Sequence, residues 1–230
     1  MRPEELHRAR RTPERAQVID GLRYLSARRD LIMPLVLLAI IGTFGFNFQL
    51  ALPLMAKTEF HADAGSFGLL TVALAVGSLC AAFATTARRG RPSARTVPVA
   101  AIAFGSLEAA AGWAPTCAAA LVLLVPTGFA TLWFTQATNH RVQLGTDPRY
   151  RGRVMALHTL ILQGSTPLGA LFVGLLAEEA GARSGLRVGG LVALAAGLAV
   201  VAAERRQRGR GPDEPDLREA DQPPRTSVTQ

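Results

Sequence analysis

The chain has 230 residues, of which 49% are hydrophobic and 18% charged, and its formal net charge is +8. Soluble domains usually carry about 25% charged residues, so this chain is poor in charge. Its hydrophobic residues lie in six blocks, and blocks of about 20 residues with almost no charge are typical of membrane-spanning helices. The composition therefore excludes a compact soluble enzyme.

The six hydrophobic blocks predict six transmembrane helices. We expect these helices at residues 31–56, 64–87, 97–114, 117–139, 154–177 and 186–203. At a rise of about 1.5 Å per residue, such lengths give roughly 27–39 Å, enough to cross a hydrocarbon core of about 30 Å. The expected fold is an all-α, multi-pass membrane bundle over residues 31–203.

The two ends of the chain are polar. Residues 1–30 are rich in arginine, and Val18, Leu22 and Leu25 recur on one side of residues 14–29. This pattern predicts a cytoplasmic linker with an amphipathic helix that lies at the membrane surface. Residues 204–230 hold six arginines, six acids and four prolines, a composition typical of a disordered, charged cytoplasmic tail.

The charges between the blocks predict the orientation of the chain. Alternate segments share one side of the membrane, and the cytoplasmic side holds the excess of Lys and Arg. Of the 25 such residues, 22 fall on the side that also holds both termini, and only Lys57, Arg183 and Arg187 fall on the other. We therefore expect both termini in the cytoplasm and the chain in the inner cell membrane. This distribution also argues against a nucleic-acid partner, despite the basic charge.

The sequence offers no motif for enzymatic chemistry. It has no metal-ligand spacing, no nucleophile elbow and no phosphate-binding loop, and its four histidines do not cluster. We therefore expect no catalytic residue, no metal and no cofactor, and we predict that the chain is not an enzyme. The expected partners are the lipid bilayer and a small-molecule substrate.

Glu108 is the one acid within a predicted span. Inserting an acid near the centre of a membrane helix costs about 2.5–3.5 kcal/mol, so the side chain should face the bundle interior or water. One interpretation is a proton-coupling or cation-substrate site. The other is a tolerated acid that reaches toward the membrane surface or bonds a neighbouring helix.

Uncharged polar side chains inside the spans are candidates for the lining of a substrate cavity. Asn47 and Gln49 point to different faces of the first span, Gln136 lies in the fourth, and His158 and Gln163 lie in the fifth. Side chains of this kind also form hydrogen bonds between membrane helices, each contributing about 0.6–2 kcal/mol. Both interpretations stay open for each of these residues.

Small residues organise the fifth span. Gly164, Gly169 and Gly174 lie among other small residues at four-residue spacing, which permits close helix packing. Pro167 removes one backbone donor and should bend the helix. The functional interpretation is a bending surface for alternating access, and the simpler one is tight packing.

Several segments together resemble exporters of the major facilitator superfamily. The runs RYRGRVMAL at 149–157, GSTPLG at 164–169 and GLLAEEAG at 174–181 are similar to the tenth-to-eleventh helix region of its drug and siderophore exporters. The run FGFNFQLALP at 44–53 is similar to the seventh helix of the enterobactin-type branch, and DGLRYL at 20–25 to the segment before it.

The resemblance implies proton-driven efflux of small amphipathic molecules by alternating access, between two six-helix halves that enclose a central cavity. The loop at 88–95 occupies the position of the cytoplasmic gating motif, whose cations bond neighbouring helix ends, and this implies a gating role for Arg88, Arg89 and Arg91. The acidic residue usual in that motif is missing here. Glu108 falls where a small or apolar residue is expected.

By the same resemblance the chain corresponds to the carboxy-terminal half of such an exporter. It is then either a gene fragment or a half-transporter that pairs with itself or with a separate amino-terminal half. The alternative from another functional class is a non-transporting membrane protein, either a remnant or a helix bundle that only binds partners.

Overall fold

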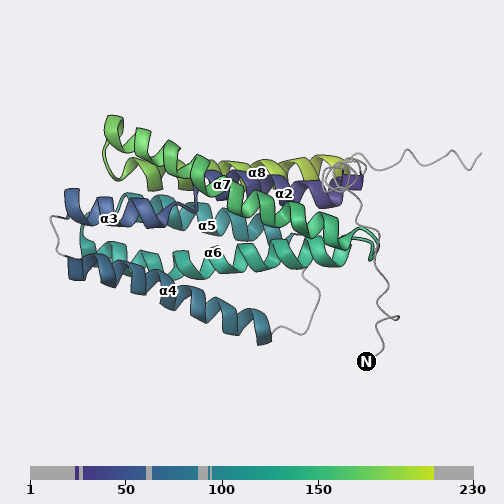
Figure 1. The fold of residues 1–230 in the computed structure, drawn as a ribbon, viewed down its shortest axis with the longest axis horizontal. Coiled ribbons are helices and arrows are strands. Elements are labelled where there is room, and N and C mark those ends of the chain that lie inside the picture. The colour runs from purple at the N-terminus through teal and green to yellow at the C-terminus, as the bar shows by residue number, and fades with distance from the viewer. Residues whose placement is uncertain (1–23, 26–27, 61–63, 88–92, 94, 210–230) are drawn as a thin grey trace, which may run out of the picture.

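The structure is a computed structural model that describes residues 24–25, 28–60, 64–87, 93 and 95–209. Its elements run nearly parallel or antiparallel to one another along the long axis of the molecule (Figure 1). They are α2 (Arg29–Phe44), α3 (Phe48–Thr58), α4 (Ala64–Ala87), α5 (Thr96–Gly112), α6 (Cys117–Gly145), α7 (Arg151–Ala180) and α8 (Ser184–Gly209).

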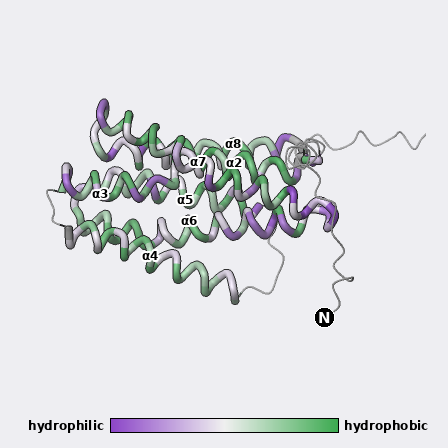
Figure 2. Tube along the Cα trace, viewed as in Figure 1, coloured by the Kyte–Doolittle hydropathy of each residue, from purple (hydrophilic) through white to green (hydrophobic). Residues whose placement is uncertain are grey.

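The predicted class, an all-helical membrane protein, is confirmed. Five helical stretches of the described residues are long and apolar enough to cross a membrane, and α5 is a shorter apolar helix. The first of these stretches runs over α2 and α3 together. Hydrophobic residues dominate the middle of the elements, and hydrophilic ones gather toward the ends of the bundle (Figure 2).

The helix bounds differ from the expected spans in several places, and α6 and α7 are both longer than expected. The first span is not continuous, because α2 ends at Phe44 and α3 begins at Phe48. The third is shorter than expected, since α5 ends at Gly112, just before Trp113. The prediction that the tail begins at residue 204 is wrong for its first six residues, because α8 continues to Gly209. The predicted amphipathic helix at 14–29 lies largely outside the described residues.

The helices pack in pairs through glycines that let two backbones meet. Helix α4 packs along α6, where a Cβ on Gly77 would strike the Val125 carbonyl and a Cβ on Gly128 would strike the Leu74 carbonyl. The Ser78 hydroxyl spans the same interface and donates a hydrogen bond to the Gly128 carbonyl, at 3.1 Å. Van der Waals packing of this kind drives helix association in lipid, where no hydrophobic effect acts between helices.

The same arrangement joins α5 to α8. A Cβ on Gly105 would lie 2.6 Å from the Gly190 carbonyl, and a Cβ on Gly190 would lie 2.7 Å from the Gly105 carbonyl. These two glycines therefore face each other across the interface. Along with α2, which packs against α7 and α8, this pair forms the other side of the bundle.

Two arginine side chains stabilise the end of the bundle at the turn between α7 and α8. The Arg183 guanidinium forms an ion pair with Glu59 at the end of α3, at 2.9 Å, and lies over the Phe60 ring. The Arg187 guanidinium donates a hydrogen bond to the Gly112 carbonyl at the end of α5, at 2.9 Å. These arginines thus tie the α7–α8 turn to two other helix ends.

The α4–α6 contact can be tested with alanine. Gly77→Ala should place a methyl group against the Val125 backbone and lower the free energy of unfolding by about 1–3 kcal/mol, as overpacking does. The thermal unfolding midpoint in mild detergent should fall by roughly 2–4 °C for each kcal/mol.

Gly68→Ala on the same helix is the matched control, because nothing lies within 4 Å of a Cβ built there. Its higher helix propensity should leave the midpoint unchanged or raise it slightly. Equal midpoints for the two variants would contradict the backbone contact.

Candidate functional site

The break between α2 and α3 lies in the middle of the first membrane span. At the end of α2, the backbone N–H groups of Gly45 and Phe46 both donate to the Ile41 carbonyl, at 2.7 and 3.1 Å. A Cβ at position 45 would lie 2.7 Å from the Phe104 ring and 3.0 Å from the Ile41 carbonyl, so a side chain there would displace that ring. The chain re-enters helix after Asn47, whose carbonyl accepts from Leu50 and Ala51.

Aromatic rings pack around the break and hold its shape. The Phe44 ring meets Phe172 of α7 edge-on, with centroids 4.8 Å apart. The Phe46 ring meets Phe104 of α5 at 5.4 Å and Phe134 of α6 at 6.3 Å, also edge-on. Such edge-on pairs contribute about 0.5–1.5 kcal/mol each beyond their buried area. The alternating aromatics of the FGFNF run thus reach three different helices.

Asn47 satisfies part of the broken backbone. Its side-chain amide is buried and donates to the Thr43 carbonyl, at 2.7 Å. Gly169 of α7 lies directly against this pair, since a Cβ there would stand 2.5 Å from the Asn47 Oδ1 atom and would strike the Thr43 carbonyl. The absence of a side chain at Gly169 therefore lets α7 approach the break.

Glu108 lies on the other side of the same break. Its side chain is only 2% exposed, and its Oε2 atom has no hydrogen-bond partner within the described part of the chain. A Cβ on Gly189 of α8 would strike the Phe44 carbonyl and would lie 3.4 Å from the Glu108 Oε1 atom. The carboxyl of α5 and the last carbonyl of α2 thus approach the same point on α8.

This arrangement brings a carboxyl group near the carboxyl end of a helix. Helix C-termini carry partial negative charge and carbonyls without intrahelical donors. A buried carboxylate needs a proton or a cation to offset its charge, since an isolated charge in a low-dielectric region is costly. A proton on the Glu108 carboxyl would remove this cost.

The other predicted cavity residues do not meet Glu108 in one place. Gln49 and Gln163 are exposed, and Gln136 is half-buried. Arg88, Arg89 and Arg91, predicted to act in gating, lie outside the described residues.

Of the three glycines predicted to pack closely along α7, only one contacts another helix among the described residues. Gly169 meets α2, whereas a Cβ on Gly164 or Gly174 would touch nothing within 4 Å, so close packing at these two glycines is not seen among the described residues. Pro167 is exposed, and α7 runs through it as one helix.

The break itself is the main feature that the sequence analysis did not predict. Gly45 and Asn47 in the middle of an apolar block were the available signal, because both residues favour helix ends. His158 of α7 and Thr138 of α6 are further buried polar side chains, and His158 Nε2 and Thr138 Oγ1 have no hydrogen-bond partner among the described residues. Buried polar atoms without partners are uncommon and mark possible functional positions.

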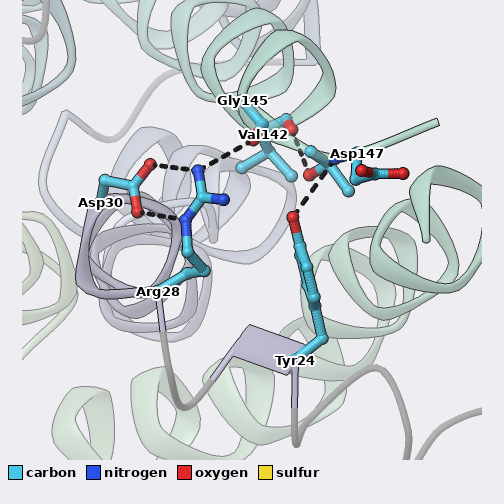
Figure 3. A network of polar contacts seen from close by, with 7 residues as sticks. Tyr24, Arg28, Asp30, Val142, Gly145 and Asp147 are labelled. Atoms are coloured by element: carbon cyan, nitrogen blue, oxygen red, sulfur yellow. Dashed lines mark hydrogen bonds and ion pairs between the residues drawn. The ribbon is translucent and has the colours of Figure 1, made fainter. Parts of the chain in front are cut away.

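A second polar cluster joins the segment before α2 to the α6–α7 turn (Figure 3). The Arg28 guanidinium pairs with Asp30 through two hydrogen bonds, at 3.0 and 3.1 Å, and reaches the Gly145 carbonyl at 3.3 Å. Asp30 raises the pKa of Arg28 above its ordinary value, through the hydrogen bond first and Coulomb attraction second. This cluster lies at the end of the bundle opposite the α7–α8 turn.

Aromatic stacking extends this cluster. The rings of Tyr24 and Tyr150 are stacked with centroids 4.4 Å apart, and the Asp147 N–H donates to the Tyr24 hydroxyl at 3.3 Å. Arg28 lies over the Tyr24 ring and Arg153 over the Tyr150 ring. The segment before α2 is thus held against the turn between α6 and α7 by Tyr24 and Arg28.

The role of Asn47 can be tested against a neighbour that was also predicted to line a cavity. Asn47→Ala removes the donor to the Thr43 carbonyl and should lower the free energy of unfolding by about 1–3 kcal/mol. Gln49→Ala changes an exposed side chain and should stay within about 0.5 kcal/mol of wild type. Thermal unfolding in detergent separates them, and an equal loss in both would show that Asn47 does not stabilise the break.

Comparison with known proteins identifies the family of the chain. Residues 5–224 match the family described as transmembrane secretion effector, a family of the major facilitator superfamily. No curated protein and no solved structure matches the chain. Because the family match covers nearly the whole sequence, the chain belongs to the transmembrane secretion effector family of major facilitator transporters.

Proposed function

We propose that this chain exports small amphipathic molecules across the inner cell membrane by alternating access, driven by proton entry, with both termini in the cytoplasm. Its family membership supports membrane transport. The observation that carries the coupling is the buried Glu108 carboxyl, which adjoins the end of a helix that is interrupted within the membrane. Interrupted helices form the binding sites of many secondary transporters.

Glu108 acts in this proposal as the group that gains and loses the proton. With the proton bound, the carboxyl is neutral and can donate a hydrogen bond to a carbonyl at the end of α2. Without it, the negative charge lies beside the partial negative charge of that helix end, which is unfavourable. The two states therefore favour different positions of α2 relative to α5 and α8, and this difference couples protonation to movement.

The break is the element that moves. Residues 45–47 have few helical hydrogen bonds to lose, so α2 and α3 can change their mutual angle at low cost. Gly169 and Gly189 contact the break from α7 and α8 without side chains that would interlock with it. The polar side chains Asn47, Gln49, Gln136 and Gln163 are the proposed lining of the substrate path.

The proposed assembly contains a second six-helix unit, either another copy of the chain or a separate amino-terminal half. Helix α7 exposes Gln163, Gly164 and Gly174 together with Leu168 and Leu171. A face that mixes an amide, bare glycines and leucines suits contact with protein better than contact with lipid alone.

Coupled transport can be measured with ethidium as a cationic amphipathic probe. Proteoliposomes that contain the full chain should move ethidium several-fold faster when a pH gradient is imposed. Glu108→Gln should abolish this acceleration, because the amide cannot exchange a proton, and should retain ethidium counterflow without a gradient. Glu179→Gln is the matched control, since Glu179 is exposed near the end of α7.

Equal acceleration by the pH gradient in wild type and Glu108→Gln would remove Glu108 from the mechanism. Loss of acceleration in both Glu108→Gln and Glu179→Gln would show a general effect of removing an acid.

The second candidate function is a partner-binding bundle that does not transport, and the exposed α7 face favours it as well. The mass of the purified chain in mild detergent discriminates between the two. A monomer that shows no transport of ethidium with or without a gradient would support the second candidate, whereas a twelve-helix assembly is expected for a transporter.

A further inference from the structure

A groove lies between α5 and α6, on a face of α5 other than the one that meets α8. Its volume is about 510 Å³, within the range of binding sites for small ligands. Eleven residues line it: Ser93, Arg95, Thr96, Val99, Ala100, Ala103, Leu107, Pro126, Phe129, Ala130 and Trp133. None of the proposed cavity residues and no part of the Glu108 site is among them.

Small side chains create this groove. Ala100 and Ala103 on α5 and Ala130 on α6 leave space that larger residues would fill. Pro126, within α6, lines the same space. The walls are formed by larger apolar side chains such as Leu107 and Phe129.

The groove is polar at one end and apolar along the rest. Arg95, exposed, and Ser93 and Thr96, whose hydroxyls lie 3.2 Å apart, form the polar end where α5 begins. From Arg95 to Leu107 the groove follows 12 residues, roughly 18 Å at helical rise, which is about the depth of one leaflet of a 30 Å hydrocarbon core. Arg95 thus lies at one end of an apolar groove that is about as long as one membrane leaflet is deep.

We propose that this groove is a binding site for an anionic phospholipid. Its phosphate would lie at Arg95 with the Ser93 and Thr96 hydroxyls as further donors, and one acyl chain would lie between α5 and α6. Arginine pairs with phosphate through two parallel hydrogen bonds, and basic pockets between membrane helices are suited to anionic headgroups. Charge complementarity selects an anionic headgroup over a zwitterionic one. This proposal is independent of the transport function above.

Native mass spectrometry of the full chain in mild detergent tests the site with two probes, phosphatidylglycerol and phosphatidylethanolamine. Wild type should retain phosphatidylglycerol better than phosphatidylethanolamine. Arg95→Gln should weaken phosphatidylglycerol retention by about fivefold, the loss expected for one cation near an anionic headgroup. It should weaken phosphatidylethanolamine retention less, because the ammonium group of that lipid offsets the charge of its phosphate. Ala103→Leu fills the apolar slot and should weaken retention of both lipids.

Each variant has a matched control outside the groove. Arg149→Gln removes an exposed arginine on the α6–α7 turn, and Ala199→Leu enlarges an exposed alanine on α8. Both should retain lipid as wild type does. Helical circular dichroism and a single elution peak establish that each variant is folded, and the comparison of the two lipids on wild type does not depend on any variant.

Three outcomes would overturn the proposal. The first is equal retention of the two lipids by wild type, and the second is equal retention of phosphatidylglycerol by Arg95→Gln and Arg149→Gln. The third is that Arg95→Gln and Ala103→Leu slow ethidium transport while lipid retention is unchanged, which would assign the groove to the transported substrate instead.

Discussion

A membrane helix that is interrupted inside the bilayer leaves carbonyl groups that water cannot satisfy, and the rest of this structure is arranged around that constraint. The break at residues 45–47 exposes the carboxyl end of α2. The Asn47 amide covers the Thr43 carbonyl, and the N–H groups of Gly45 and Phe46 share the Ile41 carbonyl. Helices α5, α7 and α8 then close around the break, and α5 contributes the Glu108 carboxyl at the point where the last carbonyl of α2 meets α8.

Small residues allow the neighbouring helices to pack against the break. Gly169 and Gly189 bring two helix backbones against the break, where any side chain would collide. Contacts between backbones fix the distance between helices without interlocking side chains, which is compatible with the proposed shift of α2 along α7 and α8. The charged contacts lie elsewhere, at the two ends of the bundle, where Arg183 and Arg187 fasten one end and the Arg28–Tyr24 cluster fastens the other. Polar contacts at both ends of the bundle and a broken helix in its middle suit a protein that alternates between two arrangements.

The sequence predicted the helical membrane class, and it predicted that Glu108 faces the bundle interior or water, with an acid that reaches toward the membrane surface as the alternative. Both expectations follow from the cost of polar groups in hydrocarbon. It did not predict the break, because glycine is also frequent in continuous membrane helices. The rings of Phe104, Phe134 and Phe172 that pack around the break come from distant helices. Nor did it predict that Gly169 packs against α2 while Gly164 and Gly174 do not, because the spacing of small residues does not show which turn of α7 faces α2. The groove at Arg95 likewise depends on small side chains from two helices that meet in space.

The central claim is that Glu108 exchanges a proton when the break rearranges around a substrate. Proton release measures this directly: ethidium is added to the purified chain in weakly buffered detergent, and a pH indicator reports the protons that appear. Wild type should release about one proton per Glu108 site and Glu108→Gln none, with ethidium still bound by both. Equal release by the two proteins, or binding without release in wild type, would contradict it.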